Sequence, residues 1–185
     1  MKLNKNDKKD EMILRHTTKV KTNLLKPNNI SRRTNIKYVF ATSDILESYI
    51  YALHGNVKLM ITKENNKAIC IFCGNLKDFI IEDGDRMILK EKSYIYRVKA
   101  SKFIHYRGDE WIATEEVPVE KTEKVIEDVD MILEQGVYLF YFPEGFSEEE
   151  LKKIEEILMD EEKITLKIKK IKEISNIVLI NKDIL

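Results

Sequence analysis

The chain is short of the residues that most often interrupt or cross-link a fold: its 185 residues include two cysteines, three prolines and six glycines. Two cysteines cannot build the disulfide framework of a small secreted domain, so both are expected to be reduced. No apolar run approaches the roughly 18 residues that a membrane-spanning helix needs. Residues 1–11 are polar, with no apolar segment behind them, which predicts a flexible tail rather than a signal peptide. Together these absences predict a cytoplasmic protein.

Net charge is also lacking, because 32 basic residues balance 32 acidic ones. A protein that binds nucleic acid usually carries a positive face, since contacts to phosphate dominate its affinity. Here the lysines are dispersed among acids, and the one compact basic run covers residues 167–173. The charge therefore gives no support to a nucleic-acid-binding protein. The hydrophobic content of 43% is enough for one domain with a substantial core.

The apolar pattern mixes the periods of strands and helices, which predicts an α+β fold. Strands are expected over residues 12–18, 37–43, 58–73 (a hairpin turning at residues 64–67), 85–91, 93–100, 110–119, 136–142, 163–171 and 175–181. Helices are expected over residues 43–55, 123–135 and 147–162, with a loop over residues 22–35. Ser43 is expected to cap the first helix, and Ser147 and Glu150 to form a capping box on the last.

This pattern predicts three segments along the chain. A flexible tail over residues 1–11 precedes a main domain over residues 12–146. Residues 147–185 then form an extension of a helix and strands, packed on the same domain.

The residues with reactive side chains point to no site when each is taken alone. Cys70 and Cys73 have the C-x-x-C spacing of zinc and redox sites, but no second pair of ligands lies nearby. They fall in an apolar strand rather than at a helix N-terminus, so we interpret them as core cysteines. His16 ends a strand, His54 closes a helix, and His105 lies in a loop before a strand. Each histidine alone suggests a structural role.

Four short motifs, in this order, suggest a function. They are His16–Thr18 at the end of a strand, Val39–Thr42 in a strand that leads into a helix, Ser48–Tyr51 in that helix, and Asp109–Ile112 opening a late strand. In this order they resemble the ADP-ribosyltransferase fold, in the branch of the poly(ADP-ribose) polymerases and RNA 2′-phosphotransferases. The resemblance covers residues 12–120, and its motifs are short.

The resemblance implies an ADP-ribosyltransferase-like split β-sheet core and a reaction with NAD as substrate. The bond between nicotinamide and ribose would break, and ADP-ribose would pass to a protein, a nucleic acid or water. Glu110 would accept a hydrogen bond from the ribose hydroxyl beside the anomeric carbon, as its positive charge develops. His16 would hold the ribose on the adenosine side, and Tyr51 would stack on the nicotinamide ring.

Further residues would complete the NAD site, and no metal is expected. Arg32 and Arg33 would neutralise the pyrophosphate, although a solvated pair in a loop is the competing interpretation. Thr17 stands where the family often has the glycine whose backbone holds the nicotinamide amide. Thr42 ends the second motif beside the cofactor. Tyr49 competes with the tyrosine of the third motif for the stacking role.

Two alternatives stay open at this point. Glu115 and Glu116 are the candidate acids if the late strand is displaced in register. The fold could also be a catalytically inactive binding module, with residues 147–185 contacting a protein partner. In that case the same residues need not share one site. If residues 163–171 instead complete the sheet, the extension belongs to the architecture.

Overall fold

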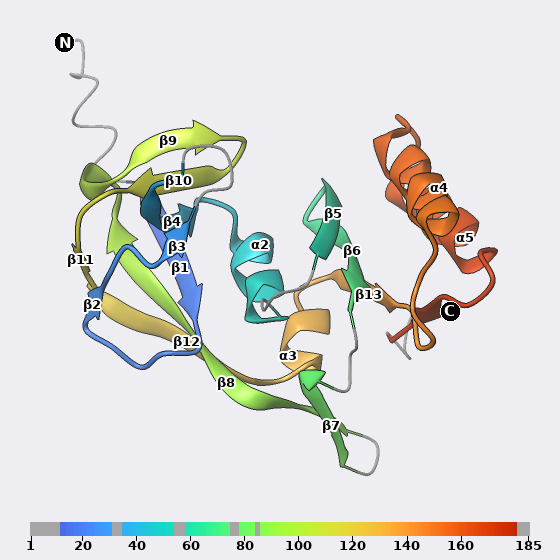
Figure 1. Ribbon diagram of the computed structural model, residues 1–185, viewed down its shortest axis with the longest axis horizontal. Coiled ribbons are helices and arrows are strands. Elements are labelled where there is room, and N and C mark those ends of the chain that lie inside the picture. Colours follow the sequence, from blue (N-terminus) through green and yellow to red (C-terminus); the bar gives the residue numbers. More distant parts are fainter. Residues whose placement is uncertain (1–11, 31–34, 54–57, 75–77, 84–85, 181–185) are drawn as a thin grey trace. The chain divides into compact units, whose positions relative to one another are not determined.

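A computed structural model describes residues 12–30, 35–53, 58–74, 78–83 and 86–180. It has an α+β fold in which most elements are strands (Figure 1). Its contacts divide the chain into two compact units. The first unit contains residues 1–52 and 92–126, and the second contains residues 53–91 and 127–185. Each unit is described by itself.

The first unit contains a sheet with the strand order β12-β8-β1-β4-β10-β9. These strands are β1 (Ile13–Thr18), β4 (Lys37–Thr42), β8 (Arg86–Lys99), β9 (Ile104–Arg107), β10 (Glu110–Ala113) and β12 (Lys121–Asp128). Short strands β3 (Asn29–Ile30) and β4 pair, as do β2 (Leu24–Leu25) and β11 (Val117–Pro118). Its core has Leu14, Val39 and Tyr96 at its centre, each at most 1% exposed.

The sheet opens between β1 and β4. In the described part of the chain, β1 pairs with β8 along its whole length but meets β4 at a single register pair, Arg15 opposite Thr42. Helix α2 (Ile45–Ile50) follows β4 and continues as a 3-10 turn, η1 (Tyr51–Leu53). The hydroxyl of Thr17 on β1 donates to the Ser48 carbonyl of α2 at 2.6 Å. This hydrogen bond joins α2 to β1 at Thr17, two residues beyond Arg15, where β1 pairs with β4.

Asp44 begins α2, in place of the expected cap Ser43. The Asp44 carboxylate accepts from the Glu47 backbone N–H at 2.9 Å, as an N-cap does. The Ser43 hydroxyl instead donates to the Asp109 side chain at 3.2 Å. The expected cap was therefore wrong by one residue, because Ser43 lies beside β10 and is bound there.

The second unit contains a sheet with the order β14-β13-β6-β5, covered on one face by helices α4 and α5 (Figure 1). The elements are β5 (Lys58–Glu64), β6 (Lys67–Cys73), β13 (Val137–Tyr141), β14 (Val178–Leu179), α4 (Glu148–Met159) and α5 (Ile164–Lys172). β5 and β6 form the expected hairpin, with Asn65 and Asn66 at positive φ in its turn. β13 runs parallel to β6. Strand β7 (Ile80–Asp83) pairs with the first part of β8, and the short helix α3 (Asp130–Leu133) also lies in this unit. The 3-10 turn η3 (Ala100–Lys102) lies in the first unit.

Several expected elements agree with the structure. Strands β1, β4 and β13 and the capping box of Ser147 and Glu150 on α4 are confirmed. The expected strands over residues 85–91 and 93–100 are one strand, β8. The expected strand over residues 110–119 is two, β10 and β11.

Other expected elements are wrong. The first part of the helix expected over residues 123–135 is instead strand β12, which pairs in the sheet of the first unit, and only α3 is helical there. The strand expected over residues 163–171 is helix α5, which packs its apolar side into the core of the second unit. The loop expected over residues 22–35 contains β2 and β3, and His105 lies on β9 rather than in a loop.

The main domain expected over residues 12–146 is divided between the two units. Ile154, Ile168 and Ile171 of the expected extension are 0%, 9% and 0% exposed, and they share one core with Ile71 of β6. The extension is therefore part of the second unit's architecture. Among the helices that the structure describes, none has the length and apolar character to cross a membrane.

Candidate active site

The end of β4 and the start of β10 bring together motifs that are far apart in the sequence. Thr42, the last residue of β4, is the cross-strand partner of Glu110, the first residue of β10. Just beyond them, the Ser43 backbone N–H donates to the Asp109 carbonyl at 3.0 Å. Since direct cross-strand partners share a face of a sheet, Thr42 and Glu110 lie on the same face.

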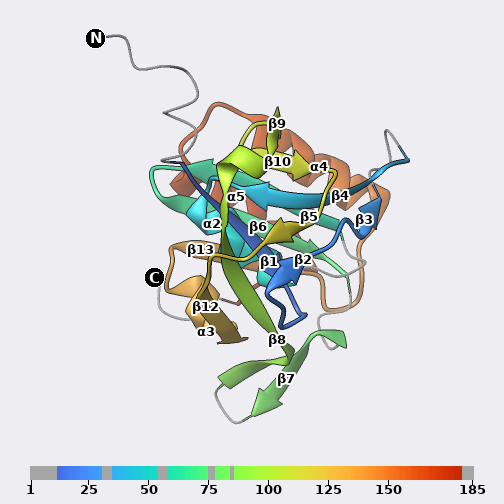
Figure 2. The same cartoon turned by 90° about the vertical axis from the view of Figure 1, so that its left-hand side faces the viewer.

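Glu110 lies on the hairpin of β9 and β10, which continues the sheet beyond β4 (Figure 2). Its cross-strand partner is Arg107, and Gly108 and Asp109 form the turn between them. Arg107 Nε donates to Glu110 Oε2 at 2.5 Å. A register shift between Glu110 and Trp111 interrupts the ladder just after the acid. Bulges of this kind re-aim side chains and are frequent beside active sites.

Tyr51 contacts the other oxygen of Glu110. Its hydroxyl lies 3.5 Å from Glu110 Oε1, at the long limit of a hydrogen bond. Burial raises the pKa of Tyr51 well above its ordinary value, and the charges of Glu47 and Glu110 raise it further. The phenol therefore stays protonated and donates, while the Glu110 side chain, at 24% exposed, keeps limited access to solvent.

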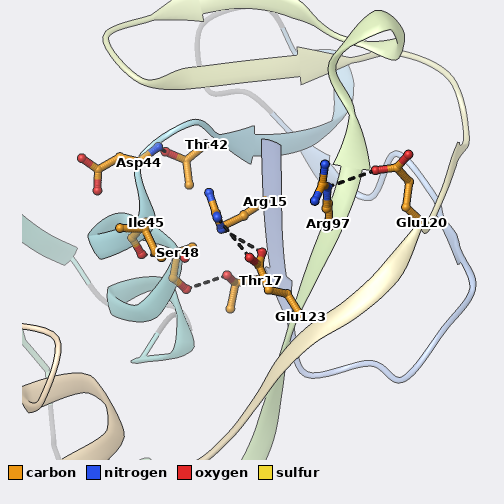
Figure 3. Close-up of polar contacts among 9 residues, drawn as sticks. All are labelled: Arg15, Thr17, Thr42, Asp44, Ile45, Ser48, Arg97, Glu120 and Glu123. Atoms are coloured by element: carbon orange, nitrogen blue, oxygen red, sulfur yellow. Dashed lines mark hydrogen bonds and ion pairs between the residues drawn. The ribbon is translucent and has the colours of Figure 1, made fainter. Parts of the chain in front are cut away.

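Thr42 fixes the junction of β4 and α2. It is 1% exposed, and its hydroxyl donates to Glu47 Oε2 at 2.8 Å. The Thr42 hydroxyl oxygen also accepts a hydrogen bond from the Asp44 backbone N–H at 3.1 Å (Figure 3). This hydroxyl is already committed to the junction, so its structural role is clear from the geometry.

His16 lies at the opening between β1 and β4. Arg15 and Thr17 share one side of β1, and strand alternation directs His16 to the other. Its Nδ1 lies 2.6 Å from the Phe40 carbonyl, and since a carbonyl only accepts, Nδ1 carries the proton. The structure thus brings Tyr51 and Glu110 together, whereas His16 contacts the backbone of β4.

Arg15 and Glu123 form a charged pair that the sequence did not reveal. Arg15 binds both carboxylate oxygens of Glu123 on β12, at 2.8 and 3.1 Å (Figure 3). Arg15 is 12% exposed and Glu123 30%. The pair lies near Tyr49, whose pKa is raised by burial and by Glu123, with Arg15 acting against them. Glu123 was assigned to a helix, so nothing in the sequence placed it beside β1.

Arg107 is the other site residue that the sequence interpretation missed. A signal for it was present, because a two-residue Gly-Asp turn makes the residues on either side of it direct partners. Along the sheet, Arg15, Thr42, Glu110 and Arg107 are successive cross-strand partners on β1, β4, β10 and β9. Glu110 therefore lies between Thr42 and Arg107 in this row, and Arg107 is the arginine that binds it.

The remaining candidates are placed as follows. Arg32, Arg33 and His54 lie outside the described residues. His105 bonds the Gly108 carbonyl through Nε2 at 2.8 Å and meets Trp111 edge to face, so it supports the hairpin. Glu115 and Glu116 are exposed between β10 and β11.

The two cysteines are buried thiols in β6. Burial raises the pKa of Cys70, which keeps the thiol protonated and unreactive. Within the described ranges, no group of three or more His, Cys, Asp or Glu side chains is arranged to hold a metal ion.

Comparisons with family models, with curated proteins and with solved structures found no match to this chain.

Proposed function

We propose that the protein is an NAD-dependent ADP-ribosyltransferase, with the Glu110 carboxylate as its catalytic group and its site in the first unit. The observation that carries the proposal is the contact between the Tyr51 hydroxyl and the Glu110 carboxylate. These residues come from two of the four motifs and are 59 positions apart. The divergence of β1 and β4 also supports the proposal, since the resemblance implies a split sheet.

The reaction needs a carboxylate close to a developing positive charge. As the bond between the anomeric carbon and nicotinamide breaks, nicotinamide leaves with the electron pair and the ribose becomes cation-like. Glu110 Oε1 would accept a hydrogen bond from the neighbouring ribose hydroxyl, a contact that strengthens as the charge grows. The nucleophile of the acceptor, or water, then bonds to the anomeric carbon and loses its proton.

The contact between Glu110 and Tyr51 suits this role. The Tyr51 contact at 3.5 Å is long and weak, so a ribose hydroxyl can replace it at Oε1 with little loss. Tyr51 keeps its ring for stacking on nicotinamide.

Nicotinamide release from NAD tests the proposal, with Glu110→Gln as the decisive variant. The substitution keeps the size of the side chain and removes its charge, and we expect the rate to fall on the order of a hundredfold or more. Glu120→Gln is the matched control, because Glu120 also pairs with an arginine, Arg97, at 3.4 Å. We expect this control to keep the wild-type rate.

Two further variants separate the alternatives. Glu115→Gln and Glu116→Gln test the other candidate acids of the late strand, and both should retain activity. If neither turnover nor NAD binding by calorimetry is found for the wild type, the proposal is wrong. A non-catalytic binding module would then be the better description.

A further inference from the structure

Arg107 and Glu110 are held opposite each other by the shortest type of hairpin connection. Two residues, Gly108 and Asp109, separate them. Gly108 has a φ of +49°, in the left-handed region that other residues rarely adopt. The backbone positions of the arginine and the acid are therefore fixed by the turn before any side chain contact forms.

The two oxygens of the Glu110 carboxylate have unequal partners. Oε2 accepts a charge-assisted hydrogen bond from Arg107 Nε at 2.5 Å, which is short even for this type of bond. Oε1 has the Tyr51 hydroxyl at 3.5 Å. The Arg107 guanidinium also lies 5.6 Å from the centroid of the Tyr106 ring, at the distance of a cation–π contact.

We propose that Arg107 is a positioning residue, which holds Glu110 by Oε2 so that Oε1 faces Tyr51 and the reacting ribose. This inference rests on the proposed function, because it assigns a further role in the same reaction. Arg107 itself is 60% exposed and acts on the substrate through Glu110.

The positioning role of Arg107 follows from how the Glu110 carboxylate would behave without a bound arginine. A glutamate side chain on a strand rotates about its terminal torsion and presents either oxygen, or neither, to the ribose. A charge-assisted bond to one oxygen removes most of these orientations, and the other oxygen is then correctly placed before the substrate binds. Loss of Arg107 should therefore lower kcat and leave the KM for NAD nearly unchanged.

The kinetic test compares Arg107→Ala, Arg107→Lys and Arg97→Ala in nicotinamide release. We expect kcat to fall on the order of tenfold in Arg107→Ala, with KM within about twofold of the wild type. Arg107→Lys should recover part of this loss, since it keeps the charge and loses the planar group. Arg97→Ala is the matched control, because Arg97 of β8 also pairs with a glutamate, Glu120, and this variant should keep wild-type kinetics.

A second measurement is independent of turnover. The Nε–H proton of Arg107, observed by ¹H–¹⁵N NMR, should exchange slowly with water in the wild type, because it is bound by Glu110 Oε2. In Glu110→Gln the charge is lost, and the exchange should become several times faster.

The outcomes separate the two proposals. An active wild type together with an equally active Arg107→Ala overturns the positioning role alone. Fast exchange of the Arg107 proton in the wild type, unchanged in Glu110→Gln, also overturns it. A wild type that releases no nicotinamide overturns the proposed function, and the positioning role with it.

Discussion

Tyr51 links the ionisation of one side chain to the stability of the fold. Burial and the neighbouring carboxylates of Glu47 and Glu110 raise its pKa, so the folded protein keeps a proton that the unfolded chain releases above about pH 10. Below that pH both states hold the proton, and Tyr51 adds no pH dependence. Above it, the unfolded state binds fewer protons, so stability falls by up to about 1.4 kcal/mol per pH unit.

The variant Tyr51→Phe removes this titration. Urea unfolding at about pH 8, 10 and 11 should show a smaller alkaline loss of unfolding free energy in Tyr51→Phe than in the wild type. The other tyrosines and the lysines titrate in both proteins, so the difference between the two slopes isolates Tyr51. Equal slopes would contradict the buried position of the phenol beside Glu47 and Glu110.

At the residue scale, the sequence offered candidate residues for a site, and most of the contacts between side chains could not be predicted from it. The order of the motifs singled out Tyr51 and Glu110, and the structure places them in contact. The pairing of Arg15 with Glu123 was not predictable, because it joins residues 108 positions apart across an intervening strand. Arg107 needed only the turn rule, since its partner is three residues away.

At the element scale, the start of α2 depends on Asp44. The Asp44 side chain satisfies the Glu47 backbone N–H, which would otherwise have no partner in the helix. We expect Asp44→Ala to lower the unfolding free energy by about 1 kcal/mol, measured by urea unfolding. Asp44→Asn keeps an acceptor oxygen at the same place and should lose much less. Equal losses in the two variants would show that Asp44 acts through its charge and not as a cap.

Two misassigned elements show why periodicity alone could not decide the fold. In residues 163–171 apolar residues alternate at Ile164, Leu166 and Ile168, as in a strand. Leu166 is nonetheless 46% exposed, while Ile164, Ile168 and Ile171 are buried at helical spacing. The strand period and the helix period both fit the sequence of residues 163–171. Packing against the sheet of the second unit selects the helix.

Residues 123–135 show the opposite case. Their apolar spacing fits a helix, yet residues 121–128 form β12 at the edge of the first sheet. Pairing with β8 satisfies the backbone groups on one side of this segment, and that partner is distant in sequence. Pairing with a distant strand therefore overrides the local pattern. No short window of the sequence contains the information about that pairing.

At the scale of the whole molecule, the chain returns to each unit after leaving it. The second unit is completed when β13 pairs in parallel with β6, although about sixty residues separate them, and parallel strands always need such a crossover. Boundaries read along the sequence assume continuous domains, so the division at residue 146 could not describe this arrangement.

The separate cores of the two units predict how the molecule opens. Leu14 and Ile154 are each fully buried, in the first and second core respectively, so replacing either by alanine should cost about 2–5 kcal/mol. Cys73 belongs to the same core as Ile154, and both cysteines are buried in β6. A thiol reagent should therefore label the native protein faster in Ile154→Ala than in Leu14→Ala at equal loss of global stability. If both variants accelerate labelling equally, the two cores open as one cooperative unit, and the division into units has no counterpart in stability.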